Sequence, residues 1–143
     1  MSDKSKLVYI CSPYSTGDVQ ENVDRARVYC RLALKEGFIP VAPHLLYPQF
    51  LNDSDPAERE QGLACGLALL EVCAEVWVFD YTDESDGMLN EIQFAFERDI
   101  PIKVGAVTND YKIDLEQIYP FLTVLTKVRL YSRELRKKHG KDD

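Results

Sequence analysis

The chain has 143 residues, of which 45% are hydrophobic and 29% charged, as in an ordinary globular protein. This length suits one domain with a substantial core and is too short for two. The net charge of −7 argues against a protein that binds duplex nucleic acid. No apolar run approaches the ~20 residues of a membrane span, so we expect no membrane contact. The first residues lead directly into a predicted strand rather than a signal-peptide apolar region, and we therefore expect a cytoplasmic protein.

The cysteines and histidines have no spacing typical of a metal site. Cys11, Cys30, Cys65 and Cys73 each lie in an apolar context, as reduced thiols of a protein core do. We therefore expect neither a structural zinc nor any other metal.

The chain begins with a predicted buried strand over 7–11, followed by a Ser/Thr/Gly loop over 12–17. Asp18 caps the next helix, with Glu21 three residues further on, and Gly37 ends it. A single apolar stripe is predicted along this helix, consisting of Val19, Val23, Ala26, Cys30 and Ala33.

A short second strand is predicted over 38–42, where Pro40 indicates the edge of a sheet or the start of a strand. The segment 43–50 contains two prolines, which limit it to a turn or a short helix. Polar residues over 52–56 cap a further helix, which runs to about residue 73.

The third strand is predicted over 75–79, the next helix runs from Gly87 to about Asp99, and a fourth strand covers 100–104. Strands and helices that alternate at this spacing indicate right-handed crossovers between parallel strands. The sequence therefore predicts an α/β fold with a doubly wound parallel sheet of four or five strands, of the flavodoxin or Rossmann-like kind.

The last third of the chain has weaker signals. Residues 114–119 are interpreted as a short helix stopped by Pro120, and 123–138 as a longer helix with a fraying basic end. From Lys127 onward there are seven Lys or Arg residues against three acids; such a tail can contact phosphates or simply be a solvated helix end. We expect one domain over 1–143, with a core over 7–105 and a C-terminal extension over 106–143.

Three loops are predicted at the carboxyl edge of the sheet, where ligands bind in open α/β folds: 12–17, 43–50 and 80–87. They carry hydroxyls, aromatic rings, one imidazole and several carboxylates, a mixture that suits a sugar with a stacked base better than a metal. No Gly-Lys-Ser/Thr follows the first loop, which argues against hydrolysis of a nucleoside triphosphate.

Glu91 lies near the start of a helix that follows a strand and a short polar loop. The helix dipole favours the ionised carboxylate, whereas burial in a cleft raises its pKa. A poorly solvated carboxylate is a competent nucleophile towards an electrophilic sugar carbon. The simpler alternative is a glutamate that only stabilises its helix.

Two motifs resemble the nucleoside 2-deoxyribosyltransferase-like family, in particular its small bacterial and phage members and the related 2′-deoxynucleoside 5′-phosphate N-hydrolases. They are Tyr9-Ile10-Cys11-Ser12-Pro13-Tyr14 and Ser85-Asp86-Gly87-Met88-Leu89-Asn90-Glu91, the second followed by Ala95. The resemblance covers about residues 7–105.

This resemblance implies that Glu91 attacks the anomeric carbon and that Tyr9 orients it. Ser85 matches a position that is aspartate in the transferases and a phosphate-binding serine in the hydrolases; together with the hydroxyls over 12–16 it favours a 5′-phosphorylated substrate. The residues expected to bind substrate are Ser12, Pro13, Tyr14, His44, Ser85, Gly87 and Met88.

One departure concerns the proton for the leaving base, because the family aspartate is replaced by Leu67 here. Asp80, Asp83 and Asp86 are substitutes within reach along the sequence, although an ordinary acidic loop explains them equally well. His44 and Tyr14 either contact a ligand or serve the fold.

Arg59 and Glu60 are expected to form surface pairs with helix neighbours one turn away. We expect an N-glycosidase or deoxyribosyl transferase acting on a nucleoside or its 5′-monophosphate, without a metal or an organic cofactor. The alternative is a non-catalytic binding protein, a sensor or sponge for a nucleotide metabolite on the same fold. The resemblance also implies a homo-oligomer in which the C-terminal helix takes part.

Overall fold

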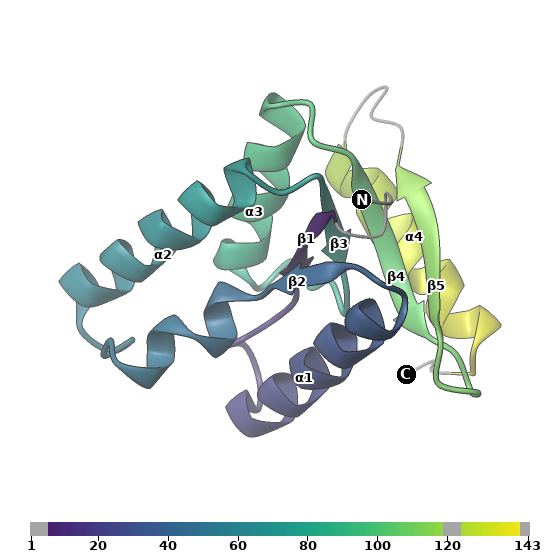
Figure 1. Cartoon of the computed structure of the whole chain (residues 1–143), viewed down its shortest axis with the longest axis horizontal. Helices are drawn as coiled ribbons and strands as arrows, with labels where there is room; N and C mark the ends of the chain where they lie inside the picture. The colour runs from purple at the N-terminus through teal and green to yellow at the C-terminus, as the bar shows by residue number, and fades with distance from the viewer. Residues whose placement is uncertain (1–5, 119–123, 141–143) are drawn as a thin grey trace.

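The computed structural model describes residues 6–118 and 124–140. Five strands form one sheet in the order β2-β1-β3-β4-β5; the first four are parallel, and β5 is antiparallel to β4 (Figure 1). The predicted α/β fold with a doubly wound parallel sheet is confirmed, except that the edge strand β5 is antiparallel. The elements are β1 (Leu7–Cys11), α1 (Val19–Lys35), β2 (Ile39–Val41), the 3-10 helices η2 (Pro43–Leu45) and η3 (Tyr47–Gln49), α2 (Pro56–Glu71), β3 (Glu75–Val78), α3 (Asp86–Glu97), β4 (Ile102–Val107), β5 (Ile113–Ile118) and α4 (Val124–Lys138).

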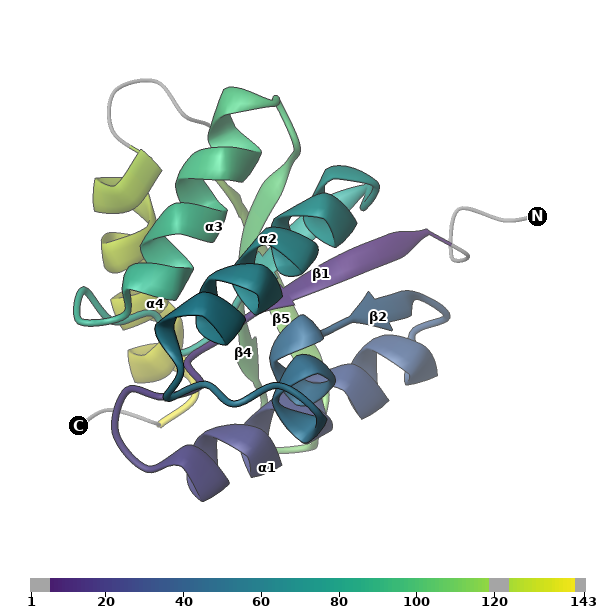
Figure 2. The same ribbon diagram turned by 90° about the vertical axis from the view of Figure 1, so that its left-hand side faces the viewer.

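Two apolar clusters, one on each face of the sheet, form the core. On the first face, α1 packs against the central strands through Tyr29 and Ala33, which contact Val8, Ile10, Trp77 and Phe79. On the second face, α2, α3 and α4 contribute Leu70, Ile92 and Val128 to a cluster with Val76, Val78 and Val104. Figures 1 and 2 show the resulting three layers, with α1 on one side of the sheet and the other long helices on the other side.

Side-chain caps define the starts of the three helices that follow β1, β2 and β3. The carboxylates of Asp18 and Asp55 and the hydroxyl of Ser85 each accept a backbone N–H of the first turn, at 3.0–3.2 Å. The cap predicted at Asp18 is confirmed. The predicted helix ends and the start of the fourth strand differ from the structure by one or two residues, which is the usual uncertainty where a helix or strand ends.

The buried face of α1 differs from the predicted apolar stripe. Its buried residues are Asn22, Ala26, Tyr29, Leu32 and Ala33. Val19 is instead 41% exposed, because α1 covers the sheet alone and its first turn projects beyond the strands.

The short helix predicted over 114–119 is wrong, because residues Ile113–Ile118 form the edge strand β5, while 119 lies outside the described residues. Apolar Ile113 and Leu115 alternate with Asp114 and Glu116, and the two apolar side chains pack on the α1 face. This period of two is a strand signal. The antiparallel hairpin with β4 supplies the hydrogen bonds that a lone segment lacks.

The C-terminal helix is part of the core. Val128 and Leu135 of α4 are 0% and 5% exposed and pack against the α2–α3 face of the sheet. At its end, His139 and Lys138 both contact the carboxylate of Asp114 on β5, at 2.6 and 3.1 Å. The predicted C-terminal extension therefore completes the domain instead of fraying. Within the described residues, no helix is long and apolar enough to cross a membrane.

Candidate functional site

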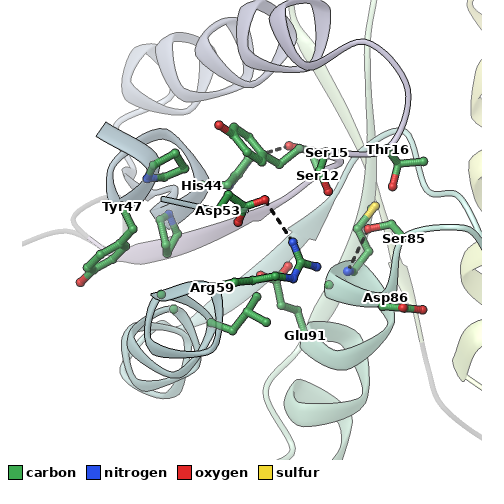
Figure 3. A pocket seen from close by; sticks show the side chains of 18 of the residues that line it. Ser12, Ser15, Thr16, His44, Tyr47, Asp53, Arg59, Ser85, Asp86 and Glu91 are labelled. Atoms are coloured by element: carbon green, nitrogen blue, oxygen red, sulfur yellow. Dashed lines mark hydrogen bonds and ion pairs between the residues drawn. The ribbon is translucent and has the colours of Figure 1, made fainter. Parts of the chain in front are cut away.

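A pocket of about 320 Å³ opens beyond the carboxyl end of β1, between the β1–α1 loop, the η2–η3 segment, α2 and the start of α3 (Figure 3). We call it the Glu91 pocket. Eight of the nine residues predicted to form the site line it: Tyr9, Ser12, Tyr14, His44, Ser85, Gly87, Met88 and Glu91. The others in its wall are Ser15, Thr16, Pro43, Tyr47, Pro48, Leu51, Asp53, Glu58, Arg59, Gly62, Leu63, Gly66, Glu84 and Asp86.

Glu91 and Tyr9 meet in this pocket although 82 residues separate them in the chain. The Tyr9 hydroxyl on β1 donates to Glu91 Oε2 at 2.6 Å. Burial raises the pKa of Glu91 to about 7, against the opposing effect of hydrogen bonds from Tyr9 and Cys11. Burial and the nearby carboxylate raise the pKa of Tyr9 well above its usual value, so Tyr9 keeps its proton and acts as the donor. Glu91 is therefore a half-ionised carboxylate at neutral pH, held in one orientation.

Ser12 and His44 form a second polar pair in the pocket. The Ser12 Oγ at the end of β1 lies 2.9 Å from His44 Nε2 on η2. Burial lowers the pKa of His44 to about 4, so the imidazole is neutral at physiological pH. A neutral imidazole and a hydroxyl can exchange hydrogen bonds with a sugar or a base, and they add no charge to the pocket.

Asn22 holds the β1–α1 loop in place, and sequence reasoning missed it. Its side-chain amide, buried in the first turns of α1, donates to the carbonyl oxygens of Tyr14 and Thr16 at 2.9 and 2.7 Å. The signal was a polar residue on the otherwise apolar side of a helix, next to a loop. Through these bonds Asn22 sets the position of the hydroxyls that the loop presents to the pocket.

The start of α3 forms another wall. Ser85, only 8% exposed, uses its Oγ to accept the backbone N–H of Met88, which leaves the hydroxyl proton free for a ligand. Met88 is 1% exposed and anchors the first turn in the core. Asp86, an exposed residue of the same turn, lines the rim of the pocket, and its carboxylate is directed away from Glu91 (Figure 3).

Arg59 lies in the pocket, contrary to the expected pairing with a helix neighbour one turn away. It extends from α2 towards Asp53, with an Nη1–Oδ2 distance of 3.1 Å (Figure 3). Gly62 and Gly66 follow on the same side of α2 and also line the pocket. These two glycines, four residues apart in a helix, were the available signal, because a glycine inside a helix often marks a close approach.

The pocket is acidic. Five carboxylates line it, against Arg59 as the one Lys or Arg among its described residues: Asp53, Glu58, Glu84, Asp86 and Glu91. Because the guanidinium already pairs with one of them, the pocket favours a neutral or cationic ligand over an anion.

One predicted site residue, Pro13, and the position of the missing family aspartate, Leu67, lie outside this pocket. Pro13 is buried and lines a different cavity. Leu67, which replaces the family aspartate, packs against the core between α2 and the sheet. Of the α2 residues that line the pocket, Glu58 is the one acid, and the stretch from Gly62 to Gly66 carries none.

Of the three aspartates considered as substitutes, only Asp86 reaches the pocket. Asp80 accepts a hydrogen bond from the Tyr29 hydroxyl in the neighbouring cavity. Asp83 pairs with Arg129 of α4 at 2.7 Å. Within residues 6–118 and 124–140, no group of three His, Cys, Asp or Glu side chains could hold a metal ion.

No curated protein matches this chain. A family model described as "Domain of unknown function (DUF7768)" matches residues 6–105, which include the Glu91 pocket and end within β4. The chain belongs to this family of domains.

Proposed function

We propose that this protein cleaves the N-glycosidic bond of a nucleoside, as an N-glycosidase or a deoxyribosyl transferase, with Glu91 as the nucleophile. The observation that carries the proposal is the hydrogen bond of 2.6 Å between the Tyr9 hydroxyl and Glu91 in the wall of a pocket. The resemblance to the nucleoside 2-deoxyribosyltransferase-like family, based on the motifs that contain Tyr9 and Glu91, supports the same roles.

The reaction has two displacements. A carboxylate oxygen of Glu91 bonds to C1′ while the C1′–N bond breaks, and the bonding electron pair leaves with the base, which takes up a proton. Water, or a nitrogen of a second base, then bonds to C1′, releases the Glu91 carboxylate and loses its own proton. Two inversions retain the anomeric configuration.

Asp86 is our candidate for the group that passes a proton from water to the leaving base, and its carboxylate has to take up that proton before the base departs. It is the one substitute aspartate in the pocket wall, at the start of the helix that carries Glu91. His44 is a weaker donor, because its lowered pKa leaves it neutral at physiological pH.

The charge of the pocket favours an unphosphorylated nucleoside. A 5′-monophosphate carries nearly two negative charges and would meet Glu84 and Asp86 beside the Ser85 hydroxyl at the start of α3. The hydroxyls of Ser12 and Ser85 remain able to donate, but hydroxyls alone offset less repulsion than an unpaired arginine would. The nucleoside is therefore our first choice of substrate and the 5′-monophosphate our second.

A non-catalytic binding protein is the second candidate. It is favoured by Leu67, which lies in the core where the family places an acid, and by the absence of a carboxylate from Gly62 to Gly66 on α2. In that case Glu91 would accept hydrogen bonds from ribose hydroxyls.

We also propose a homo-oligomer and a cytoplasmic location. Leu46, Phe50 and Leu63, at or beside the mouth of the pocket, are 51%, 63% and 40% exposed, and a second copy would cover them. All four cysteines are free thiols, as in a reducing compartment.

The proposal is tested by incubating the protein with ribonucleosides, deoxynucleosides and their 5′-monophosphates and separating free base by chromatography. We expect base release from a nucleoside, reduced at least about a thousandfold in Glu91→Gln. The melting temperature of the variant serves as the folding control. Equal turnover by wild type and variant would refute the nucleophile, and nucleoside binding without any base release would select the binding protein.

A further inference from the structure

Two further cavities lie at the same carboxyl edge of the sheet, on the side of the β1–α1 loop away from the Glu91 pocket. The α4 groove, of about 460 Å³, is lined by Tyr81, Thr82, Asp83, Arg129, Ser132, Arg133, Arg136 and Lys137. It continues into the β4 cavity, of about 810 Å³, which lies over the end of β4 and the first turns of α1. The two share Tyr81, Thr82, Ser132 and Arg136, so they adjoin each other.

The α4 groove is basic. Arg133, Arg136 and Lys137 lie within about one turn of α4, on the side that faces the β3–α3 loop. Arg136 also donates to the Tyr81 carbonyl oxygen at 3.4 Å. The one carboxylate of the groove, Asp83, is already paired with Arg129. Three cationic side chains therefore remain for a ligand, in contrast to the acidic Glu91 pocket.

Ser132 points to a ligand independently of this charge. It lines both cavities and is 7% exposed, and its buried Oγ has no hydrogen-bond partner among the described residues. Buried hydroxyls nearly always have a partner, and leaving one unsatisfied costs free energy. A ligand oxygen in the groove would supply that partner, next to the Thr82 hydroxyl.

The β4 cavity contains two residues in the left-handed backbone region. Asp80 has φ +52° and Tyr111 has φ +62°, and such conformations in residues other than glycine cluster at functional sites. Tyr111, at the β4–β5 turn, is 60% exposed and lines the cavity. An exposed aromatic side chain at the edge of a cavity is suited to stacking on a heterocycle.

We propose that the α4 groove and the β4 cavity together bind a nucleotide, with its phosphates on Arg133, Arg136 and Lys137 and its base beside Tyr111. The Ser132 hydroxyl donates to a phosphate oxygen. This site is separate from the Glu91 pocket. Through it, a phosphorylated metabolite regulates the protein. A single-stranded nucleic acid is the less favoured occupant, because the protein as a whole carries −7 and the cations are confined to one groove.

The test is calorimetric titration of the full chain with ADP, adenosine and a short single-stranded oligonucleotide at low ionic strength. Adenosine is itself a ligand expected in the Glu91 pocket, so it is used as a competitor for the groove. We expect ADP to bind, and adenosine to displace bound ADP at least tenfold more weakly than ADP itself binds. Arg133→Ala and Lys137→Ala should each weaken ADP binding about tenfold, since each removes a charged hydrogen bond to phosphate. Tyr111→Ala should weaken it several-fold through lost stacking.

Two controls make the result specific. Lys138→Ala removes the same charge from the next position of α4, where the side chain pairs with Asp114 outside the groove, and should leave ADP binding unchanged. Glu91→Gln should also leave it unchanged. The proposal is overturned by absence of ADP binding, by tighter binding of the oligonucleotide than of ADP, by equal losses in Lys137→Ala and Lys138→Ala, or by loss in Glu91→Gln.

Discussion

The Glu91 pocket and the α4 groove lie at the same carboxyl edge of one sheet, yet they have opposite electrostatic character. The first contains five carboxylates and one paired guanidinium, the second several cations and one paired carboxylate. In doubly wound sheets this edge is where ligands bind, whatever their charge. Strand topology therefore determines where a ligand site lies, whereas the side chains of the covering helices determine which ligand it suits.

The two sites also differ in how strongly water screens their charges. Glu91 is shielded by Tyr9, Cys11 and the walls of the pocket, so its ionisation is costly and its pKa rises. The cations of α4 are mostly exposed, and an exposed ion pair contributes only about 0–1 kcal/mol. Binding in the groove should therefore weaken with added salt, and binding of a neutral nucleoside in the pocket should not.

The largest effect is expected in the pH dependence of stability. The pKa of Glu91 is about 7 in the folded protein against 4.5 for an ordinary glutamate, so folding favours the protonated form. This contribution is fully present below about pH 4.5 and is lost as the pH rises through 7, which lowers the free energy of unfolding by about 3 kcal/mol.

Urea denaturation of wild type and Glu91→Gln from pH 4 to pH 8 measures this effect as the difference between the two proteins. The comparison cancels the contributions of the other carboxylates to the pH dependence of stability. One of these is Asp114, whose pKa is lowered by His139, so that its contribution to stability increases as the pH rises. Parallel curves would mean that Glu91 is well solvated and that the proposed contrast between the two sites is wrong.

Removal of the Tyr9 hydroxyl should have the next largest effect. In the wild type, the hydrogen bond of 2.6 Å from the Tyr9 hydroxyl lowers the pKa of Glu91. Tyr9→Phe removes this donor, so the pKa of Glu91 should rise. We expect kcat/KM for base release to fall about 10- to 100-fold and its pH profile to move to higher pH. Tyr14→Phe, which removes a different tyrosine hydroxyl from the lining of the same pocket, is the matched control. A lower rate with an unmoved pH profile would assign Tyr9 to packing alone.

Gly66→Ala should separate stability from ligand binding in the Glu91 pocket. A Cβ there would lie 3.4 Å from the Tyr9 hydroxyl, an ordinary contact, and alanine favours a helix over glycine by about 0.5–1 kcal/mol. We therefore expect a higher melting temperature and weaker nucleoside binding. Gly62→Ala, whose Cβ would meet Leu51 at 3.4 Å, should stabilise α2 similarly with less effect on the ligand. A destabilised Gly66→Ala protein would show that the Tyr9 hydroxyl leaves no room for a Cβ at this position.

The smallest effect concerns the charge of the Glu91 pocket. Asp53→Asn removes the partner of Arg59, a half-exposed pair, and should change the free energy of unfolding by less than about 1 kcal/mol. It should raise the affinity for a 5′-monophosphate several-fold relative to the nucleoside, as measured by calorimetry, because the guanidinium becomes available. An unchanged ratio would show that the acidic lining does not select against phosphate.

Much of the fold and the centre of the site were predictable from local signals. The strand over Leu7–Cys11, the cap at Asp18 and the loop–helix junction before Glu91 depend on residues close together in the chain. The Tyr9–Glu91 pairing was expected only through a family resemblance, because no local pattern relates two residues on different elements. The strand β5 was missed because a short alternating segment next to proline forms a strand only when a neighbouring strand pairs with it.

The amino-acid sequence by itself determined the α/β class, the helix starts and a carboxylate at a ligand-binding edge, because hydrophobic period and capping act over a few residues. Three other features depend on how distant segments pack. Arg59 lies in the Glu91 pocket, Leu67 packs against the core, and the basic end of α4 borders a groove. The physical reason is that helix faces acquire their surroundings from the packing of distant segments. The charge of each site is therefore a property of the assembled fold.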